Sequence, residues 1–358
     1  MNAPFFPSQL SVRLADLRDP NEHARIERFV ADHPAATPFH RPAWVLAVTE
    51  GTGNASLALV SERGGEIAAY LPLSEVHSPV FGRVLASSGF AVDGGVLEAR
   101  AGETATLIAA AEELAQRRSC PTIELRGGVL PQARDGWFLK TESHCGFVLA
   151  LAGDDEAQLK AIPRKQRAEV RKGLDADLTV SIGRDPAERD AHYAVYAESV
   201  RNLGTPVFPR ALFEAVLDRF GDDADILTVR HQDRPVASVL SLYHRGAVMP
   251  YWGGGTQGAR RLRANDRMYF ELMLHARRRG CDRFDFGRSK TGSGAYHFKR
   301  NWGFEPEPLT YATWNAPGLE ARDADPTSAR HRLRIAVWQR LPLRVANRLG
   351  PLIARGLG

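Results

Sequence analysis

The spacing of apolar residues divides the chain into two successive sections that each mix helices and strands. In the first section, apolar runs on both sides of Gly64-Gly65 predict a β-hairpin. Residues 102–118 place apolar side chains three and four positions apart, which predicts an amphipathic helix, and a strand is expected directly after it at 121–127. The second section repeats this order. Its expected helices lie near 163–173, 185–203, 210–220 and 266–279, with three strands before the last helix and one strand at 282–287.

Two helix–strand joints share a pattern at a distance of 161 residues. Residues 117–124 and 278–285 each begin with two Arg, place a Cys before the expected strand and end on an acidic residue late in that strand. Repetition of this kind favours a duplication and therefore two related domains; chance similarity of two joints is the alternative. Cys120 and Cys281 are then expected in the core, because cysteine is among the most buried residue types.

The composition is that of a globular protein in a reducing compartment. The 358 residues are 44% hydrophobic and 25% charged, which is typical of a globular chain of about two domains. The low count of three Cys indicates a reducing compartment, and no apolar run is long enough to span a membrane. The N-terminal residues lack the pattern of a secretory leader, so none is expected. We therefore expect a cytoplasmic protein.

The positive charge is concentrated near the C-terminus. The net charge is +5, yet residues 326–358 contain seven Arg and no acidic residue, which leaves the remainder slightly acidic. This distribution argues against a general nucleic-acid coat and for a local contact with an anion.

Familiar catalytic signatures are absent from the sequence. There is no G-x-S-x-G, H-E-x-x-H, P-loop or C-x-x-C pattern, and the eleven His show no metal-ligand spacing. The glycines at 253–255 are not continued into a dinucleotide fingerprint. No metal site and no tightly bound cofactor are expected.

Residues 284–308 are the densest candidate for a site. A short strand is followed by Arg288, Ser289 and a Gly-rich turn, and then by Tyr296 and Lys299. Polar and aromatic side chains at the carboxyl end of a strand suit a binding cleft, where cations hold phosphate or stabilise an oxyanion. The alternative is a solvated loop whose aromatic residues fill the core.

A basic segment at 159–173 is the second candidate. If the segment is helical, Arg164, Arg167 and Arg171 share one face, and clustered cations of this density match phosphate recognition. An exposed basic helix without a ligand is the alternative. Tyr251 and Trp252 are further candidates for substrate contact, although core packing is the ordinary role of aromatic residues in a strand.

Taken together, these segments resemble the FemAB family, in the branch associated with exosortase (PEP-CTERM) systems. The resemblance covers nearly the whole chain, and its longest run is FDFGRSKTGSGAYHFKRNWGFEPEP; FHRPAW, RKQRAEVRKG, YWGGG and the C-terminal WQRLPLRVANRLGPLIARGLG also match. It implies an α/β protein of two tandem GNAT-like acyltransferase domains, each a mixed sheet flanked by helices. These would span 8–155 and 156–316, followed by a basic helical tail at 317–358.

The resemblance also implies roles for individual residues. FemAB relatives transfer an amino acid from aminoacyl-tRNA to an amine of a peptidoglycan precursor, and a Lys in a Phe-Lys pair is linked to catalysis; the matching residue is Lys299. An Arg that opens a helix and contacts acceptor phosphate is matched by Arg210. The Lys that accompanies this Arg in the family has no counterpart after Trp44, which argues against a peptidoglycan nucleotide as acceptor.

The segment that would bind acyl-CoA in a GNAT domain is 255–266. The usual [QR]-x-x-G-x-[GA] loop directs backbone N–H groups at the pyrophosphate. If Gln257 opened this motif, Arg260 would stand where the first glycine is required. A standard CoA cradle is therefore not expected.

These observations predict an acyl- or aminoacyltransferase that acts on an envelope or exopolysaccharide precursor, a small molecule or lipid-linked. Its donor would be charged tRNA or another activated acyl group. Lys299 would stabilise the oxyanion and Asp285 is a candidate base; the substrate contacts would be Arg288, Ser289 and Tyr296, with Arg167 and Arg171 on a phosphate. An acyl-CoA-dependent N-acyltransferase acting on an amino sugar and a non-catalytic component of an envelope-assembly system are the alternatives.

The C-terminal tail carries a separate prediction. Arg residues alternate with large apolar residues, and Pro342 and Pro351 are expected to break the tail into short helices. Such a tail suits the anionic surface of the inner membrane. Packing of its apolar side on the protein body or on a partner is the alternative.

Overall fold

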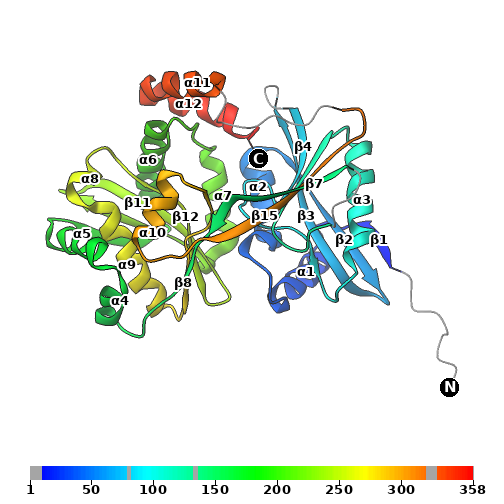
Figure 1. Cartoon of the computed structure of the whole chain (residues 1–358), viewed down its shortest axis with the longest axis horizontal. Helices are drawn as coiled ribbons and strands as arrows, with labels where there is room; N and C mark the ends of the chain where they lie inside the picture. Colours follow the sequence, from blue (N-terminus) through cyan, green and yellow to red (C-terminus); the bar gives the residue numbers. More distant parts are fainter. Residues whose placement is uncertain (1–9, 79–81, 132–135, 320–328, 358) are drawn as a thin grey trace. The chain divides into compact units, whose positions relative to one another are not determined.

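The computed structural model describes residues 10–78, 82–131, 136–319 and 329–357, without the side chains of 329–334. It divides into two compact units (Figure 1). The first unit comprises Met1–Thr141, Thr310–Ala324 and Arg355–Gly358, and the second unit comprises Glu142–Leu309 and Asp325–Ala354.

The first unit is a mixed sheet covered by helices on both faces. Its sheet runs in the order β1-β2-β3-β4-β6-β15-β7-β14, with β5 paired to β3; the edge strand β14 (Ser289–Lys290) belongs to the second unit. Leu59 packs with α3, whereas its neighbours Ala58 and Val60 pack with α1 and α2, because successive side chains of a strand point to opposite faces. The elements are β1 (Ser11–Leu14), α1 (Pro20–Asp32), the 3-10 helix η1 (Pro38–His40), α2 (Pro42–Thr52), β2 (Ala55–Arg63), β3 (Glu66–Ser78), β4 (Gly82–Ser87), β5 (Leu97–Glu98), α3 (Thr104–Arg117), β6 (Thr122–Arg126), β7 (Trp137–Gly146) and β15 (Glu307–Asn315).

The second unit has a sheet in the order β8-β13-β12-β11-β10-β9. Its helices begin and end close to the predicted positions, whereas the strand expected at 282–287 ends at Asp285. The elements are β8 (Val148–Ala150), α4 (Asp155–Ala161), α5 (Arg164–Asp175), β9 (Thr179–Gly183), α6 (Pro186–Leu203), α7 (Arg210–Phe220), the 3-10 helix η2 (Gly221–Asp223), β10 (Ala224–His231), β11 (Arg234–His244), β12 (Ala247–Gly255), α8 (Ala259–Leu262), α9 (Ala264–Arg278), β13 (Arg283–Asp285), β14 (Ser289–Lys290) and α10 (Gly294–Asn301).

The two units repeat one arrangement of elements. In each, a strand and two helices precede a three-stranded antiparallel meander, and a helix then leads to a strand that pairs in parallel with the last strand of the meander. The helix ends correspond in detail: the N–H of Cys120 donates to the carbonyl of Ala115 at 2.8 Å, and the N–H of Cys281 donates to that of Ala276 at 2.9 Å. The predicted α/β fold with two tandem GNAT-like domains is confirmed.

Two strands do not follow the order of the repeats. Strand β15 comes after the second repeat in the sequence but pairs with β6 of the first, from Tyr311 opposite Arg126 onward. Strand β8 comes before the second repeat and pairs with β13. Both β7 and β15 have residues in each compact unit. The ranges 8–155 and 156–316 for the two GNAT-like domains and 317–358 for the tail stay predictions.

The tail forms α11 (Ala329–Arg340) and α12 (Leu343–Ala354), and both helices pack on α6. The predicted break at Pro342 is confirmed, but the break at Pro351 is wrong because α12 continues through that residue. A proline removes one hydrogen bond from a helix, and here close packing of α12 on the second unit offsets that loss. No helix in the described residues is long and apolar enough to cross a membrane.

Candidate active site

A buried lysine is the centre of the candidate site in the second unit. Lys299 lies in the last turn of α10, whose first turn is capped by the hydroxyl of Ser293. Its ammonium group donates to the backbone carbonyls of Gly287 at 3.1 Å and Arg288 at 2.9 Å. The same nitrogen lies 5.2 Å from the ring centroid of Phe147. An ammonium group is therefore held in a mainly aromatic environment by backbone oxygens.

The surroundings bring the proton affinities of Lys299 and Asp285 closer together. Burial lowers the pKa of Lys299 to about 8, although the carboxylate of Asp285 acts in the opposite direction. Burial raises the pKa of Asp285, whose carboxylate accepts a hydrogen bond from the N–H of Gly287 at 2.8 Å. Pairs of groups perturbed in this way are frequent where protons are transferred.

The sheet of the second unit splits between two parallel strands close to Lys299. Strands β12 and β13 pair only at Ala247 with Arg283 and at Val248 with Phe284. β13 then ends at Asp285, whereas β12 continues to Gly255, so the two parallel strands separate at their carboxyl ends. In open α/β sheets, ligands bind outside the carboxyl ends of parallel strands. Lys299 contacts the segment that directly follows β13.

Three further predicted residues surround this lysine. Arg288 supplies one of its carbonyl partners, and Ser289 is buried beside it in β14 with its hydroxyl unpartnered in the described structure. Tyr296 is half-buried and packs edge-on against Phe147 at 5.6 Å between ring centroids. The structure therefore brings Lys299, Asp285, Arg288, Ser289 and Tyr296 together. Trp302 and Phe304 of the same segment are core residues.

A second group of predicted residues lies on α7 and β12. Trp252 is buried against Phe213, with ring centroids 4.6 Å apart, so core packing is its main role. Tyr251 is half-buried beside it. Arg210 opens α7 and is held by the carboxylates of Asp190 and Glu214, which raise its pKa. An acceptor phosphate would have to compete with these two carboxylates.

The third group lies on α5, which is helical as predicted. Arg171 is exposed, whereas Arg167 is half-buried and its Nε donates to the carbonyl of Ile162 at 3.1 Å. The start of α5 lies beside the end of α10, since a Cβ added at Gly303 would be 3.2 Å from Pro163. This contact places the basic helix next to the element that carries Lys299.

Sequence reasoning did not find two residues that shape the site. The ring of Phe147 lies against the ammonium group of Lys299. Glu198 of α6 accepts a hydrogen bond from the backbone N–H of Gln257 at 2.9 Å. Each contact joins segments that are far apart in the sequence. No local pattern at either residue signals its role.

The loop between β12 and α9 can be compared with the needs of acyl-CoA. The N–H of Gln257 is bonded to the Glu198 carboxylate, and those of Thr256 and Ala259 are bonded to backbone carbonyls. A Cβ at Gly255 would lie 2.5 Å from the side-chain oxygen of Asn265, so this side of the loop is filled. These three N–H groups already donate within the protein, one of them to a carboxylate, so they do not fit a binding site for pyrophosphate.

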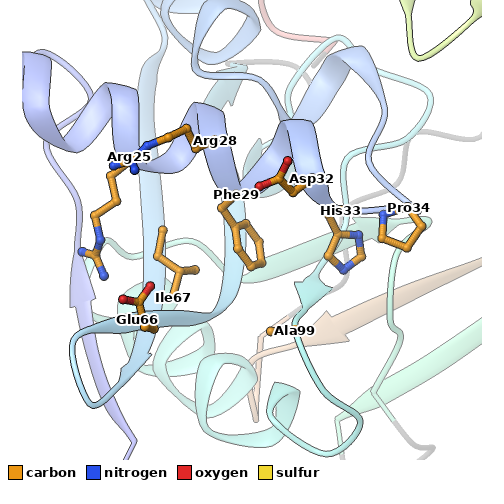
Figure 2. A pocket seen from close by; sticks show the side chains of 9 residues that line it. All are labelled: Arg25, Arg28, Phe29, Asp32, His33, Pro34, Glu66, Ile67 and Ala99. Carbon is orange, nitrogen blue, oxygen red and sulfur yellow. The ribbon is translucent and has the colours of Figure 1, made fainter.

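A pocket of about 510 Å³ lies in the first unit, beside α1 (Figure 2). It is lined by Arg25, Arg28, Phe29, Asp32, His33, Pro34, Glu66, Ile67 and Ala99, none of them a predicted site residue. Arg25 is already held by Glu62 and by the carbonyl of Gly65, and the ring of His33 bonds to the carbonyl of Glu98. Mixed charges that are paired within the protein do not define a ligand class. Within the described residues, no cluster of His, Cys, Asp or Glu could hold a metal ion.

A known family model matches part of the second unit. Residues 162–300 match the family model of the acetyltransferase (GNAT) domain. The second unit carries a GNAT domain. This match contains α5, β12, β13 and Lys299. No curated protein matches the sequence significantly.

Solved structures show the same fold over both GNAT-like units. FemX is 14% identical, with a TM-score of 0.63 over 80% of this chain and 95% of that one. A tandem GNAT protein from the clavulanic acid biosynthesis pathway is 15% identical, with a TM-score of 0.58 over 87% of this chain and all of that one. L-PGS from Bacillus licheniformis is 13% identical, with a TM-score of 0.52 over 90% and 98% of the two chains. The GNAT domain match and this shared fold support an acyltransferase.

Proposed function

We propose that this GNAT protein transfers an activated acyl or aminoacyl group to an amine or hydroxyl of a cell-envelope or exopolysaccharide precursor, with Lys299 at the centre of the reaction. One observation carries the proposal. A buried ammonium group with a lowered pKa lies where β12 and β13 separate, inside the segment that matches the GNAT domain. Groups whose pKa is strongly shifted by burial are frequent at reaction centres.

The chemistry uses Lys299 and Asp285, which interact electrostatically. The acceptor attacks the carbonyl carbon of the donor, a C–N or C–O bond forms, and the carbonyl oxygen becomes an oxyanion. Two of the three N–H bonds of Lys299 are directed at backbone carbonyls, and the third can donate to this oxyanion. The proton released by the acceptor passes to Asp285, whose raised pKa favours proton uptake. The carbonyl re-forms as the bond to the leaving group breaks, and Asp285 returns the proton to the departing group. Ser289 and Tyr296 orient the substrate throughout.

The donor is proposed to be something other than acyl-CoA, with aminoacyl-tRNA as the first candidate. The N–H groups of Thr256, Gln257 and Ala259 in the loop after β12 already donate within the protein, and that of Gln257 donates to the carboxylate of Glu198. Exposed cations on α5, among them Arg171, offer an alternative contact for phosphates of the donor or acceptor. The FemAB resemblance of residues 284–308 supports this donor and a place in an exosortase-associated envelope system.

Parallel donor assays test the proposal. The full chain would be incubated with charged tRNA, acetyl-CoA and an acyl-carrier protein, and binding and donor cleavage would be measured for each. We expect cleavage of charged tRNA that is stimulated by an amine acceptor and is lost in Lys299→Met. Lys290→Met is the matched control, because Lys290 is exposed in the same segment. Cleavage of acetyl-CoA alone would overturn the choice of donor, and full activity in Lys299→Met would overturn the proposed reaction centre.

A further inference from the structure

Helix α12 packs on the second unit through its small residues. Ala346, Gly350 and Ala354 are buried at intervals of four positions and form one face. The approach is close, since a Cβ at Gly350 would lie 2.9 Å from Cγ1 and 3.0 Å from the backbone nitrogen of Val207. Figure 1 shows α12 beside α6, which it contacts. Most of the large aliphatic side chains of α12 lie off this small-residue face.

The exposed side of α12 carries a stripe of large aliphatic residues. The exposed fractions are 41% for Val345, 42% for Leu349, 60% for Leu352 and 39% for Ile353. Their spacing of three and four positions places them on one side of the helix. An ordinary surface helix buries its large apolar residues and exposes its polar ones. The reversed arrangement leaves a partly exposed apolar stripe on the surface of the second unit.

A row of cations runs beside this stripe. Arg344 and Arg348 are exposed one turn apart, and Arg340 is exposed at the end of α11. No acidic residue occurs from 326 to 358, although seven Arg do. The surface that covers the stripe must therefore be anionic as well as apolar. RNA would satisfy the Arg row but would leave the aliphatic stripe in water.

We propose that α12 lies in the headgroup region of an anionic phospholipid bilayer, with its aliphatic stripe inserted and its Arg row on lipid phosphates. A helix with adjacent apolar and basic faces is suited to this position, since long Arg side chains reach the headgroups while the aliphatic residues enter the acyl boundary. The small-residue face keeps α12 attached to the second unit at the same time. The enzyme would then work at the surface on which a lipid-linked substrate is found.

Vesicle co-sedimentation of the full chain tests this proposal. Vesicles of phosphatidylcholine alone would be compared with vesicles that contain about 30 mol % phosphatidylglycerol, at about 0.1 M salt. We expect binding to the anionic vesicles only. The double variant Leu349→Ser/Leu352→Ser should weaken binding by about tenfold or more, because buried aliphatic area drives insertion. Arg344→Gln/Arg348→Gln should weaken it roughly 30-fold, at about 1 kcal/mol for each Arg.

Matched controls distinguish binding through this surface from nonspecific binding to the vesicles. Ile182→Ser removes an exposed aliphatic residue from β9, and Arg18→Gln/Arg28→Gln removes two exposed Arg from the first unit. Both controls should bind as the wild type does. Point variants are preferred to removal of the tail, because removal would uncover Val207.

Three results would overturn the proposal. They are equal binding to neutral vesicles, unchanged binding in the Leu349→Ser/Leu352→Ser variant, and a dimer in solution that this variant converts to monomer. The last result would show that a second copy covers the stripe. Donor cleavage is measured without vesicles, so the outcome is independent of the proposed function.

Discussion

Replacing Lys299 with methionine is the most direct test of the candidate site. Methionine keeps the length and apolar character of the side chain but removes the ammonium group. If this group donates to the oxyanion, turnover should fall by at least roughly tenfold, and a loss of about a hundredfold is typical for one donor of this kind. Lys290→Met, at an exposed position, should keep wild-type turnover.

The effect on stability can be worked out from the contacts. Burial of the charge holds the pKa of Lys299 near 8 instead of 10.5, which costs the native state about 3 kcal/mol at neutral pH. Methionine removes that cost but leaves the carbonyls of Gly287 and Arg288 without their donor, at about 1–3 kcal/mol each. The two effects nearly cancel. The variant should therefore unfold within about 3 kcal/mol of the wild type, so that lost turnover is not lost folding.

The pH dependence of both quantities has a definite sign. Because the folded pKa of Lys299 lies below the unfolded one, its unfavourable effect on stability is complete below pH 8 and is relieved as the pH rises toward 10.5. The wild type should thus gain stability relative to Lys299→Met across this interval. Turnover should decline above about pH 8, because only the ammonium form donates to an oxyanion.

Single-turnover cleavage of the donor identified in the parallel assays, followed from pH 6 to 10, measures the rate, and urea unfolding at the same pH values measures the stability. A rate that rises through pH 8 would refute the reasoning, since it would make neutral Lys299 a base. A rate that is unchanged in the methionine variant would remove the residue from the reaction altogether.

Three further predictions concern the stability of the second unit, the attachment of the tail and the accessibility of two cysteines. Asp225→Ala should lower the free energy of unfolding by about 3 kcal/mol in urea titrations, because the buried carboxylate accepts hydrogen bonds from Tyr243 at 2.8 Å and from His275 at 2.9 Å. Gly350→Leu should detach α12 by crowding Val207, at about 2 kcal/mol, and limited trypsin digestion should then cut the Arg-rich tail roughly 30-fold faster. A thiol reagent should modify half-buried Cys281 in the native protein, although burial raises the pKa of that thiol. The same reagent should reach Cys120 only after unfolding, because Cys120 is almost completely buried and its pKa is raised to about 11.

Local chemistry explains why many elements could be predicted from the sequence. The hairpin at Gly64-Gly65 forms because both glycines adopt positive φ, at 61° and 87°, and these values suit a tight turn. The repeated helix ends at Cys120 and Cys281 were visible because the hydrogen bonds that close them lie within five residues. Elements set by near neighbours leave a signal in a short window of sequence.

Contacts between distant segments could not be predicted in this way. The pairing of β15 with β6 joins residues 185 to 193 positions apart, from Tyr311 with Arg126 to Asn315 with Thr122. No pattern in the sequence of either strand identifies the other as its partner. Phe147 reaches Lys299 only because β8 lies beside β13. The same limitation explains the error at Pro351, where the packing of Gly350 on Val207 outweighs the local tendency of proline to end a helix.

The duplication itself gives a reason to place the reaction in the second unit. Glu124 in β6 stands where Asp285 stands in β13, 161 residues later. In the first unit this carboxylate is paired with Arg126 at 2.8 Å, and the buried Arg126 side chain also donates to the carbonyl of Ala91. In the second unit the position of that arginine is Gly287, which has no side chain to neutralise the acid. The carbonyl and N–H of this glycine instead meet Lys299 and Asp285. In the first unit the carboxylate is thus neutralised by an arginine of its own strand, whereas in the second unit a carboxylate and an ammonium group lie at the same glycine, as the proposed reaction requires.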